Sequence, residues 1–419
     1  MKRFLLIALG IAMILTAVAC NTKKEEPVSS DPTADPTADP TTEPTEKPTE
    51  KPTEKPTTEP TTEPTTEPTT EKPEDPKEPL PETVLNVADH TSDVFRQLGR
   101  TYVKDKVLNI DFACGGIEFS AECEGDVKVQ INSARDTRFT IYVDGVRSNL
   151  RPQVTTSNSG YYVTIASKLE RGEHTFRIIS QTQFIWTYGS IGNVKINGNF
   201  LPKPADREIY LEFYGDSILN GSNIFCSGGG INASDATQAF GFVTAEMMNA
   251  DMALIGCSSI GLTKNSRSFV MKDIWNYAGA RYSAFSTSAS EHLLPGIPEW
   301  DFSRIPNAII IEQGVNDGSN ASTQAFENAV KEMVDNLRAK YGKDVPIVFP
   351  VGYSKPALAY NTALPKIVEK LGGAEANLYI CKLSDAATGV PGGDGTHPGV
   401  DSTKKMAQEL SDFLKTVIK

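Results

Sequence analysis

The sequence predicts two folded domains in series, an all-β domain followed by an α/β domain with a parallel sheet. From residue 83 to about residue 199, short strand-like runs alternate with turn signals and no useful helical period occurs. After Pro202 and Pro204 the pattern changes to apolar strands that alternate with amphipathic helices. Before both domains, residues 21–82 repeat Pro, Thr and Glu with almost no apolar side chains, so this tract cannot form a core.

The chain begins with the pattern of an export signal. Lys2 and Arg3 precede an apolar run over residues 4–18, which is short for a membrane span. Residues 1–20 are therefore predicted to be a signal peptide. The run ends at Ala17-Val18-Ala19-Cys20, which resembles a bacterial lipobox and implies cleavage before Cys20 and lipid on its thiol. The alternatives are plain secretion and a retained transmembrane helix.

The tract over residues 21–82 is predicted to be an extended stalk. Its proline density stiffens the chain, and at about 3.1 Å per residue its reach is at most roughly 190 Å. With Cys20 lipidated, the two domains would stand on the extracellular face of a bacterial cell membrane; without the lipid they would be secreted. The net charge of −12, with no long basic patch, argues against nucleic acid as a partner.

The all-β domain is predicted over residues 83–202. Its turn signals include Glu124-Gly125-Asp126, Asp144-Gly145 and Arg171-Gly172, and short strands at this spacing favour a sandwich or jelly roll. The domain is either a carbohydrate-facing accessory domain or a packing partner for the next one. The expected strands are 107–112, 117–121, 127–131, 139–143, 161–165, 174–179 and 194–196.

The α/β domain is predicted over residues 203–419. Alternation of strands and helices indicates a parallel sheet covered on both faces. The expected strands begin within Glu208–Gly221 and continue at 252–255, 308–311, 345–350 and 378–383, with helices at 237–249, 323–341, 361–371 and 401–418.

The sequence contains six cysteines. With Cys20 assigned to the lipid, an odd number is left, which cannot pair completely. No Cys-x-x-Cys pair occurs, so a zinc or redox motif is not indicated. Cys114 and Cys123 either pair across neighbouring strands or, like most of the others, are buried free thiols.

Two stretches supply a nucleophile and a base. Ser217 follows an alternating strand through Gly215-Asp216, where open α/β sheets place their ligands. His397 lies in Asp394-Gly395-Thr396-His397-Pro398, between the last strand and the last helix. Asp394 can fold back to Nδ1 of His397 and fix its tautomer. The plain alternatives are a solvated Gly-Asp-Ser turn and an Asp394 that only caps the last helix.

Two further strand ends offer hydrogen-bond donors for an oxyanion. Asn316 follows the strand at 308–311 and can direct its amide at such a charge. Gly261 follows the strand at 252–255, and its N–H is accessible because glycine lets a ligand approach closely. The alternatives are an Asn-Asp turn and an ordinary bend.

Together these pieces resemble the SGNH hydrolase superfamily, whose blocks are named for Ser, Gly, Asn and His. Gly215-Asp216-Ser217 matches the first block, Gly314-x-Asn316-Asp317 the third and Asp394-x-x-His397-Pro398 the last, while Gly261 matches the second approximately. The resemblance covers residues 208–419 and implies a flavodoxin-like three-layer α/β/α hydrolase domain.

The preceding domain narrows the resemblance. A jelly roll directly before such a domain is similar to carbohydrate esterase family 2, and this likeness extends to Gly115–Phe119, Val143–Gly145 and Gly172–Thr175. It then covers roughly residues 83–419. The family removes O-acetyl groups from hemicelluloses, so the resemblance implies a serine esterase acting on acetylated xylan or glucomannan.

The resemblance also implies the site. His397 would take the proton of Ser217, and the N–H groups of Ser217 and Gly261 with the Asn316 amide would hold the oxyanion of an acetyl-enzyme reaction that needs no metal or cofactor. Trp186, Trp275 and Trp300 are candidates to line a sugar site. The rival hypotheses are an esterase acting on peptidoglycan, lipid esters or thioesters, and a surface glycan-binding protein without catalysis.

Overall fold

The structure is a computed structural model that describes residues 78–418, except 151, 227, 229, 264–266, 282–292, 355–357 and 385–395. The predicted signal peptide, Cys20, residues 21–77 of the stalk and Asp394 lie outside the described residues.

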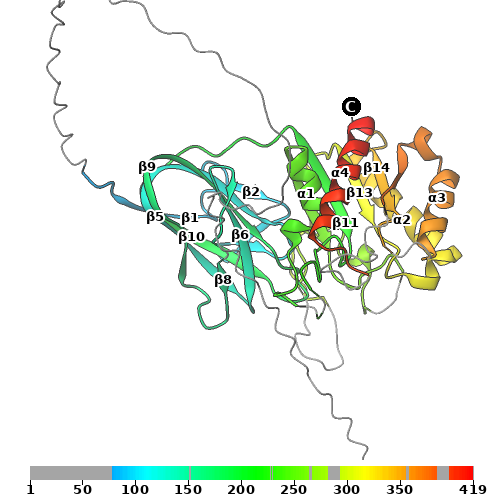
Figure 1. The fold of residues 1–419 in the computed structure, drawn as a ribbon, viewed down its shortest axis with the longest axis horizontal. Helices are drawn as coiled ribbons and strands as arrows, with labels where there is room; N and C mark the ends of the chain where they lie inside the picture. The colour runs from blue at the N-terminus through cyan, green and yellow to red at the C-terminus, as the bar shows by residue number, and fades with distance from the viewer. Residues whose placement is uncertain are drawn as a thin grey trace, which may run out of the picture. The chain divides into compact units, whose positions relative to one another are not determined.

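The all-β domain is a single antiparallel sheet of ten strands (Figure 1). The strands run in the order β3-β4-β10-β5-β9-β6-β7, with β1 beside β10, β2 beside β5 and β8 beside β6. Alternating side chains of the long strands are buried, and they form a core of this domain that includes Ile117, Phe119, Phe139 and Phe176. The strands are β1 (Glu82–Asn86), β2 (Arg96–Leu98), β3 (Tyr102–Lys104), β4 (Val107–Ile110), β5 (Gly116–Ser133), β6 (Thr137–Val143), β7 (Val146–Arg147), β8 (Gln153–Val154), β9 (Tyr162–Ser180) and β10 (Gly189–Phe200).

Two of the predicted turns in this domain are wrong. The turns predicted at Glu124-Gly125-Asp126 and Arg171-Gly172 lie inside β5 and β9, which pair with each other along almost their full length. The pairing shifts register around Gly125, whose φ is +76°. Glycine adopts that conformation without strain, so the residue makes a bulge that bends the strand instead of reversing it. By contrast, Asp144-Gly145 does form the predicted turn, between β6 and β7.

The α/β domain has a parallel five-stranded sheet in the order β12-β11-β13-β14-β15. This is the flavodoxin-like order, so the predicted fold class is confirmed. The elements are β11 (Ile209–Gly215), η1 (Ala236–Gln238), α1 (Phe240–Met247), β12 (Ala250–Gly256), η2 (Met271–Asp273), β13 (Ala308–Glu312), η3 (Gly318–Ser322), α2 (Gln324–Tyr341), β14 (Ile347–Val351), α3 (Tyr360–Lys370), η4 (Gly373–Ala376), β15 (Leu378–Lys382) and α4 (Val400–Val417).

The strand order determines where a site can lie. The chain leaves β11 toward β12 on one side and later runs from β13 to β14 and β15 on the other. Because such crossovers are right-handed, α1 covers one face of the sheet and α2 and α3 the other, while α4 packs beside α1 (Figure 1). In open α/β sheets a ligand usually binds at the carboxyl ends of the strands beside such a reversal, which here are the ends of β11 and β13.

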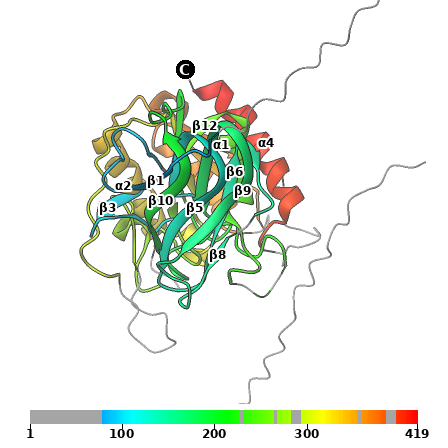
Figure 2. The same cartoon turned by 90° about the vertical axis from the view of Figure 1, so that its left-hand side faces the viewer.

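The β domain packs directly on the α/β domain, as one of the two predicted alternatives requires (Figure 2). Its residues Phe112 and Phe184 belong to the same buried cluster as the parallel strands. The ring of Phe184 lies 5.8 Å from that of Phe112 and 6.1 Å from that of Phe269 in the α/β domain. The two domains therefore share one apolar core at their junction.

Cys114, Cys123, Cys257 and Cys381 are free and buried, so Cys114 and Cys123 do not pair. Among the residues that the structure describes, no helix is both long and apolar enough to cross a membrane.

Candidate active site

Ser217 lies at the carboxyl end of β11, in a sharp bend that needs Gly215. A Cβ at Gly215 would lie only 2.6 Å from a carboxylate oxygen of Glu312 and from the side chain of Leu219. The neighbouring amides are occupied, since the Asp216 N–H donates to Glu312 Oε2 and the Ile218 N–H to Asp216 Oδ1, each at 2.9 Å. No described residue accepts a hydrogen bond from the Ser217 N–H. The bend thus leaves one amide beside the hydroxyl for a ligand.

His397 lies next to this hydroxyl although it is 180 residues away in the sequence. It precedes α4, and its Nε2 is 2.8 Å from Ser217 Oγ. That distance is within the range in which a base takes a proton from a nucleophile. Asp394, which is predicted to bond Nδ1 of His397, lies outside the described residues.

Asn316 follows β13 and is fixed by the residue before the nucleophile. Its Nδ2 donates to Asp216 Oδ2 at 2.7 Å. An amide nitrogen carries two protons, so the second one remains available for another acceptor. Asp216 is therefore the residue that orients Asn316.

Gly261 follows β12 and meets Asp317, the residue after Asn316. A Cβ at Gly261 would lie 3.0 Å from Asp317 Oδ2, so a side chain here would be tight and would push the Asp317 carboxylate away. The Asp317 carboxylate accepts from the N–H groups of Leu262 and Thr263, at 3.2 and 2.7 Å. Within the described part of the chain, the Gly261 N–H has no acceptor.

Two buried carboxyl groups lie beneath the nucleophile, and the sequence did not indicate the second. Asp216 and Glu312 are both fully buried. Burial raises the pKa of Asp216 to about 6, although the Ile218 N–H and the charge of His397 oppose this. Burial and the neighbouring Asp216 carboxylate raise the pKa of Glu312 well above its ordinary value. At neutral pH Asp216 is therefore the charged member and Glu312 the neutral one.

Gln183 of the β domain also reaches the loops of this edge, a contact that the sequence did not predict. It is 1% exposed, and its amide bonds the hydroxyls of Ser222 and Ser258 at 3.2 and 2.8 Å. No local pattern signals such a role, because these partners are 39 and 75 residues away.

The three tryptophans predicted as sugar-site candidates lie in different places. Trp275 is 8% exposed and packs against Phe302, so it belongs to the core. Trp300 lines the groove at the other end of the sheet described below. Trp186 is half-buried and bonds the Gln183 carbonyl through its N–H at 3.0 Å. Trp186 therefore belongs to the turn that contains Gln183.

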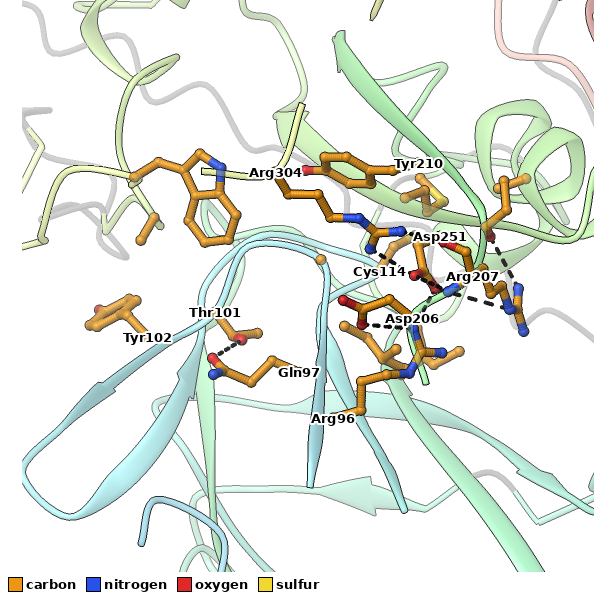
Figure 3. A pocket seen from close by; sticks show the side chains of 18 of the residues that line it. Arg96, Gln97, Thr101, Tyr102, Cys114, Asp206, Arg207, Tyr210, Asp251 and Arg304 are labelled. Carbon is orange, nitrogen blue, oxygen red and sulfur yellow. Dashed lines mark hydrogen bonds and ion pairs between the residues drawn. The ribbon is translucent and has the colours of Figure 1, made fainter. Parts of the chain in front are cut away.

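A groove of about 460 Å³ opens where the β domain meets the amino ends of β11 and β12 (Figure 3). Its charged side chains neutralise one another, with Asp251 accepting from Arg96 at 2.6 Å and from Arg304 at 2.7 Å. Because β11 separates it from Ser217 by roughly 20 Å, this groove is an interdomain joint and not the candidate active site.

Among the described residues, no group of three or more His, Cys, Asp or Glu could hold a metal ion.

The comparisons with known proteins agree with this geometry. Residues 211–410 match the family model for the GDSL-like lipase/acylhydrolases. The curated cellulase/esterase CelE of Acetivibrio thermocellus is 26% identical over 320 residues. The match covers 69% of this chain and 35% of that protein, so the chain spans about a third of the relative's length.

Solved structures match both domains. A family two carbohydrate esterase from Clostridium thermocellum in complex with cellohexaose is 22% identical, with a TM-score of 0.63, and the match covers 77% of this chain and 98% of that one. An acetyl xylan esterase from the rumen bacterium Butyrivibrio proteoclasticus is 18% identical, with a TM-score of 0.66 and coverage of 80% and 98%. At these identities the likeness establishes the fold. Residues 211–410 therefore match the GDSL-like lipase/acylhydrolases, and together with the β domain they have the fold of the family two carbohydrate esterase from Clostridium thermocellum.

Proposed function

We propose that the chain is a serine carboxylic ester hydrolase that removes O-acetyl groups from plant cell-wall polysaccharides. The observation that carries this proposal is the 2.8 Å contact between His397 Nε2 and Ser217 Oγ, at the edge where the Asn316 amide also lies. A serine that lies within hydrogen-bond distance of a base, with hydrogen-bond donors beside it, is the arrangement that catalyses acyl transfer.

In the first half of the proposed reaction, His397 takes the proton of Ser217 while Oγ attacks the acetyl carbonyl carbon. The carbonyl oxygen becomes an oxyanion, and the N–H groups of Ser217 and Gly261 with the Asn316 amide stabilise it. The tetrahedral intermediate then collapses. The sugar oxygen leaves with the proton from His397, and an acetyl-enzyme remains on Ser217.

In the second half, water attacks the acetyl-enzyme with His397 again as the base. The same donors stabilise the second oxyanion, and acetate leaves with Ser217 restored. Each donor in such a site typically accounts for about 3–4 kcal/mol of barrier. In this scheme, His397 accepts and then donates each proton that is transferred.

The substrate class rests on the relatives and on the polarity near the nucleophile. Two relatives with the same pair of domains are named as carbohydrate esterases, one of them an acetyl xylan esterase. Ser222 and Asn223 follow Ser217 where a lipase would present an apolar stripe. These observations favour an acetylated xylan or glucomannan over a lipid ester.

Acetate release from a panel of polymers tests the proposal. The purified protein should release acetate from acetylated xylan or glucomannan faster than from O-acetylated peptidoglycan, and should hydrolyse p-nitrophenyl acetate. Acetate release from peptidoglycan alone would favour the rival hypothesis of an esterase that acts on peptidoglycan. Binding of these polymers with no release of acetate or p-nitrophenol would favour a glycan-binding protein.

The chain's position outside the cell is a further part of this proposal. A lipid on Cys20 and an extended tract over residues 21–82 would hold both domains near a polymer beyond the membrane. Mass spectrometry of the N-terminal peptide should show diacylglycerol on Cys20 and no residues before it. An unmodified Cys20 would leave plain secretion.

Asp394→Asn tests whether a third group assists His397. If the Asp394 carboxylate bonds Nδ1, it selects the tautomer with Nε2 free to accept the Ser217 proton. The amide can hold the wrong tautomer, so kcat should fall by about 10²- to 10⁴-fold while KM changes little. A kcat within a few-fold of wild type would show that a Ser–His pair suffices.

Asp216→Asn and Glu312→Gln form a matched pair that tests the assignment of charge beneath Ser217. The Asp216 carboxylate accepts from both Ile218 and Asn316, whereas an amide has a single acceptor oxygen. Asp216→Asn should therefore displace Asn316 and lower kcat about 10- to 100-fold. Glu312→Gln keeps a neutral group that accepts from the Asp216 N–H, so kcat should stay within a few-fold. The opposite ranking in p-nitrophenyl acetate hydrolysis would put the charge on Glu312.

A further inference from the structure

We propose that Gln183 is a positioning residue through which the β domain fixes the oxyanion donor at Gly261. This inference rests on the proposed function. It gives the β domain a part in catalysis that differs from carbohydrate binding, because the side chain acts on the geometry of the active-site loops.

Gln183 joins two loops of the catalytic edge. Its Oε1 accepts from the Ser258 N–H at 2.6 Å, and its Nε2 donates to the hydroxyls of Ser258 and Ser222. Those two hydroxyls lie 2.9 Å from each other. The Ser222 N–H in turn donates to the Ser217 carbonyl at 2.9 Å. One buried amide therefore links the Ser222 side chain of the nucleophile loop to the loop that carries Gly261.

The loop around Gly261 is held from both of its ends. At one end, Gln183 binds the Ser258 N–H, and Arg267 Nε donates to the Ser258 carbonyl at 3.0 Å. At the other end, the Asp317 carboxylate binds the N–H groups of Leu262 and Thr263. Between these clamps the chain passes through Ser259, whose φ of +64° is unusual for a residue with a side chain.

The contacts at Ser258 precede Gly261 in the chain, and the contacts at Leu262 and Thr263 follow it. The Gly261 N–H has no acceptor among the described residues, while its carbonyl accepts from the Met271 N–H at 3.0 Å. Because no hydrogen bond to a described residue orients the Gly261 N–H, its direction depends on how the residues before and after it are held. Loss of the Gln183 hydrogen bonds would leave the Gly261 loop less firmly held at Ser258 and Ser259.

Gln183 is itself rigidly placed. Its carbonyl accepts from the N–H groups of Trp186 and Thr187, which closes a turn after β9. The next residue, Phe184, is fully buried between Phe112 and Phe269. A side chain held by such packing transmits its position to its partners, which a solvent-exposed glutamine could not do.

The test uses Gln183→Met, which keeps the shape of the side chain and removes its hydrogen bonds. Gln181→Met is the matched control, because Gln181 is also buried, at 4% exposure, and its amide bonds Thr140 within the β domain. Gln183→Glu is the rescue variant, since a carboxyl group can accept from the Ser258 N–H and bond both hydroxyls. All variants are made in the full chain.

Four quantities are measured: the kcat and the KM for p-nitrophenyl acetate, the rate at which a fluorophosphonate modifies Ser217, and the Tm. The fluorophosphonate reports on the same donors, because its phosphoryl oxygen occupies the oxyanion position. Gln183→Met should lower kcat and the phosphonylation rate together by about 10- to 100-fold with little change in KM. Gln181→Met should lower the Tm without this loss, and Gln183→Glu should recover most of the rate.

Unchanged rates for Gln183→Met, equal losses for Gln181→Met, or a change in KM alone would overturn the inference. The proposed function fails separately: a wild-type chain that reacts with the fluorophosphonate but hydrolyses no ester would refute the esterase and leave the phosphonylation comparison to decide the role of Gln183. A wild-type chain that does not react with the fluorophosphonate would refute both.

Discussion

Ser217→Ala should reduce kcat for p-nitrophenyl acetate by about 10⁴- to 10⁶-fold, because the variant lacks the hydroxyl that would form the acetyl-enzyme. His397→Ala should be comparably inactive, since the base that takes the proton is then lost. The contact of 2.8 Å between the two side chains gives the physical reason for expecting such large effects.

The double variant is the sharper test of this pair. Residues that act as one unit lose their contribution together, so Ser217→Ala with His397→Ala should be no slower than Ser217→Ala alone. Because Ser217 is 8% exposed and a small side chain replaces a small one, the Tm should change little. Turnover in pure Ser217→Ala protein would remove Ser217 from the mechanism.

Arg100→Met should destabilise the folded protein by about 3–5 kcal/mol, which is the largest stability effect we expect. Arg100 leaves the β domain and enters the core of the α/β domain, where it is fully buried beside the fully buried Glu212. Its Nη2 donates to both oxygens of Glu212, at 3.1 and 3.2 Å, and its Nη1 donates to the carbonyls of Trp275 and Tyr277. Removing the guanidinium leaves the charge of Glu212 buried without its partner.

The control for this prediction adds Glu212→Gln to Arg100→Met. The amide is neutral, and it can accept from one of the hydroxyls of Tyr210 and Tyr214 through its oxygen and donate to the other through its nitrogen; these hydroxyls bond the two oxygens of Glu212 at 2.8 Å each. The double variant should therefore recover much of the stability lost in the single one. Urea midpoints and Tm values of the three proteins measure this recovery. A single variant as stable as wild type would show that Glu212 carries no charge in the fold.

The arrangement of the parallel sheet could be predicted from the sequence because each strand ends in a segment with its own chemistry. Parallel strands place their carboxyl ends on one edge, so segments after β11, β12 and β13 had to meet once the strands were recognised. The block order Ser217, Gly261, Asn316 and His397 carried the superfamily resemblance, which the family match over residues 211–410 confirms. The same logic gives no information about Asp394, which lies outside the described residues.

The strands of the β domain were harder to predict, because a glycine in a strand-rich segment can form either a turn or a bulge. The sequence predicts a turn at both Gly125 and Gly145; Gly125 forms a bulge, and Gly145 forms the predicted turn. The difference depends on whether the flanking strands have partners along their full length, and local sequence does not record those partners. Strands β5 and β9, of 18 and 19 residues, therefore each run through two of the strands that the pattern predicts.

Buried polar partners were the other feature that the sequence concealed. Gln183, Arg100 and Glu312 are common residue types in unremarkable contexts, and their partners come from distant segments. Their importance follows from burial, because an amide or a charge without water must find a partner in the protein. Such pairs become visible only when the two domains are seen together.

The central claim is that Ser217 is the nucleophile of a serine esterase, and trapping the acyl-enzyme tests it most directly. The protein is mixed with excess p-nitrophenyl acetate, quenched in acid during the first turnover and digested for mass spectrometry. We predict that the peptide containing Ser217 carries one added acetyl group on that residue, and that His397→Ala protein carries none. Hydrolysis at the normal rate with no acetyl group on Ser217, or with the acetyl group on another residue, would contradict the account.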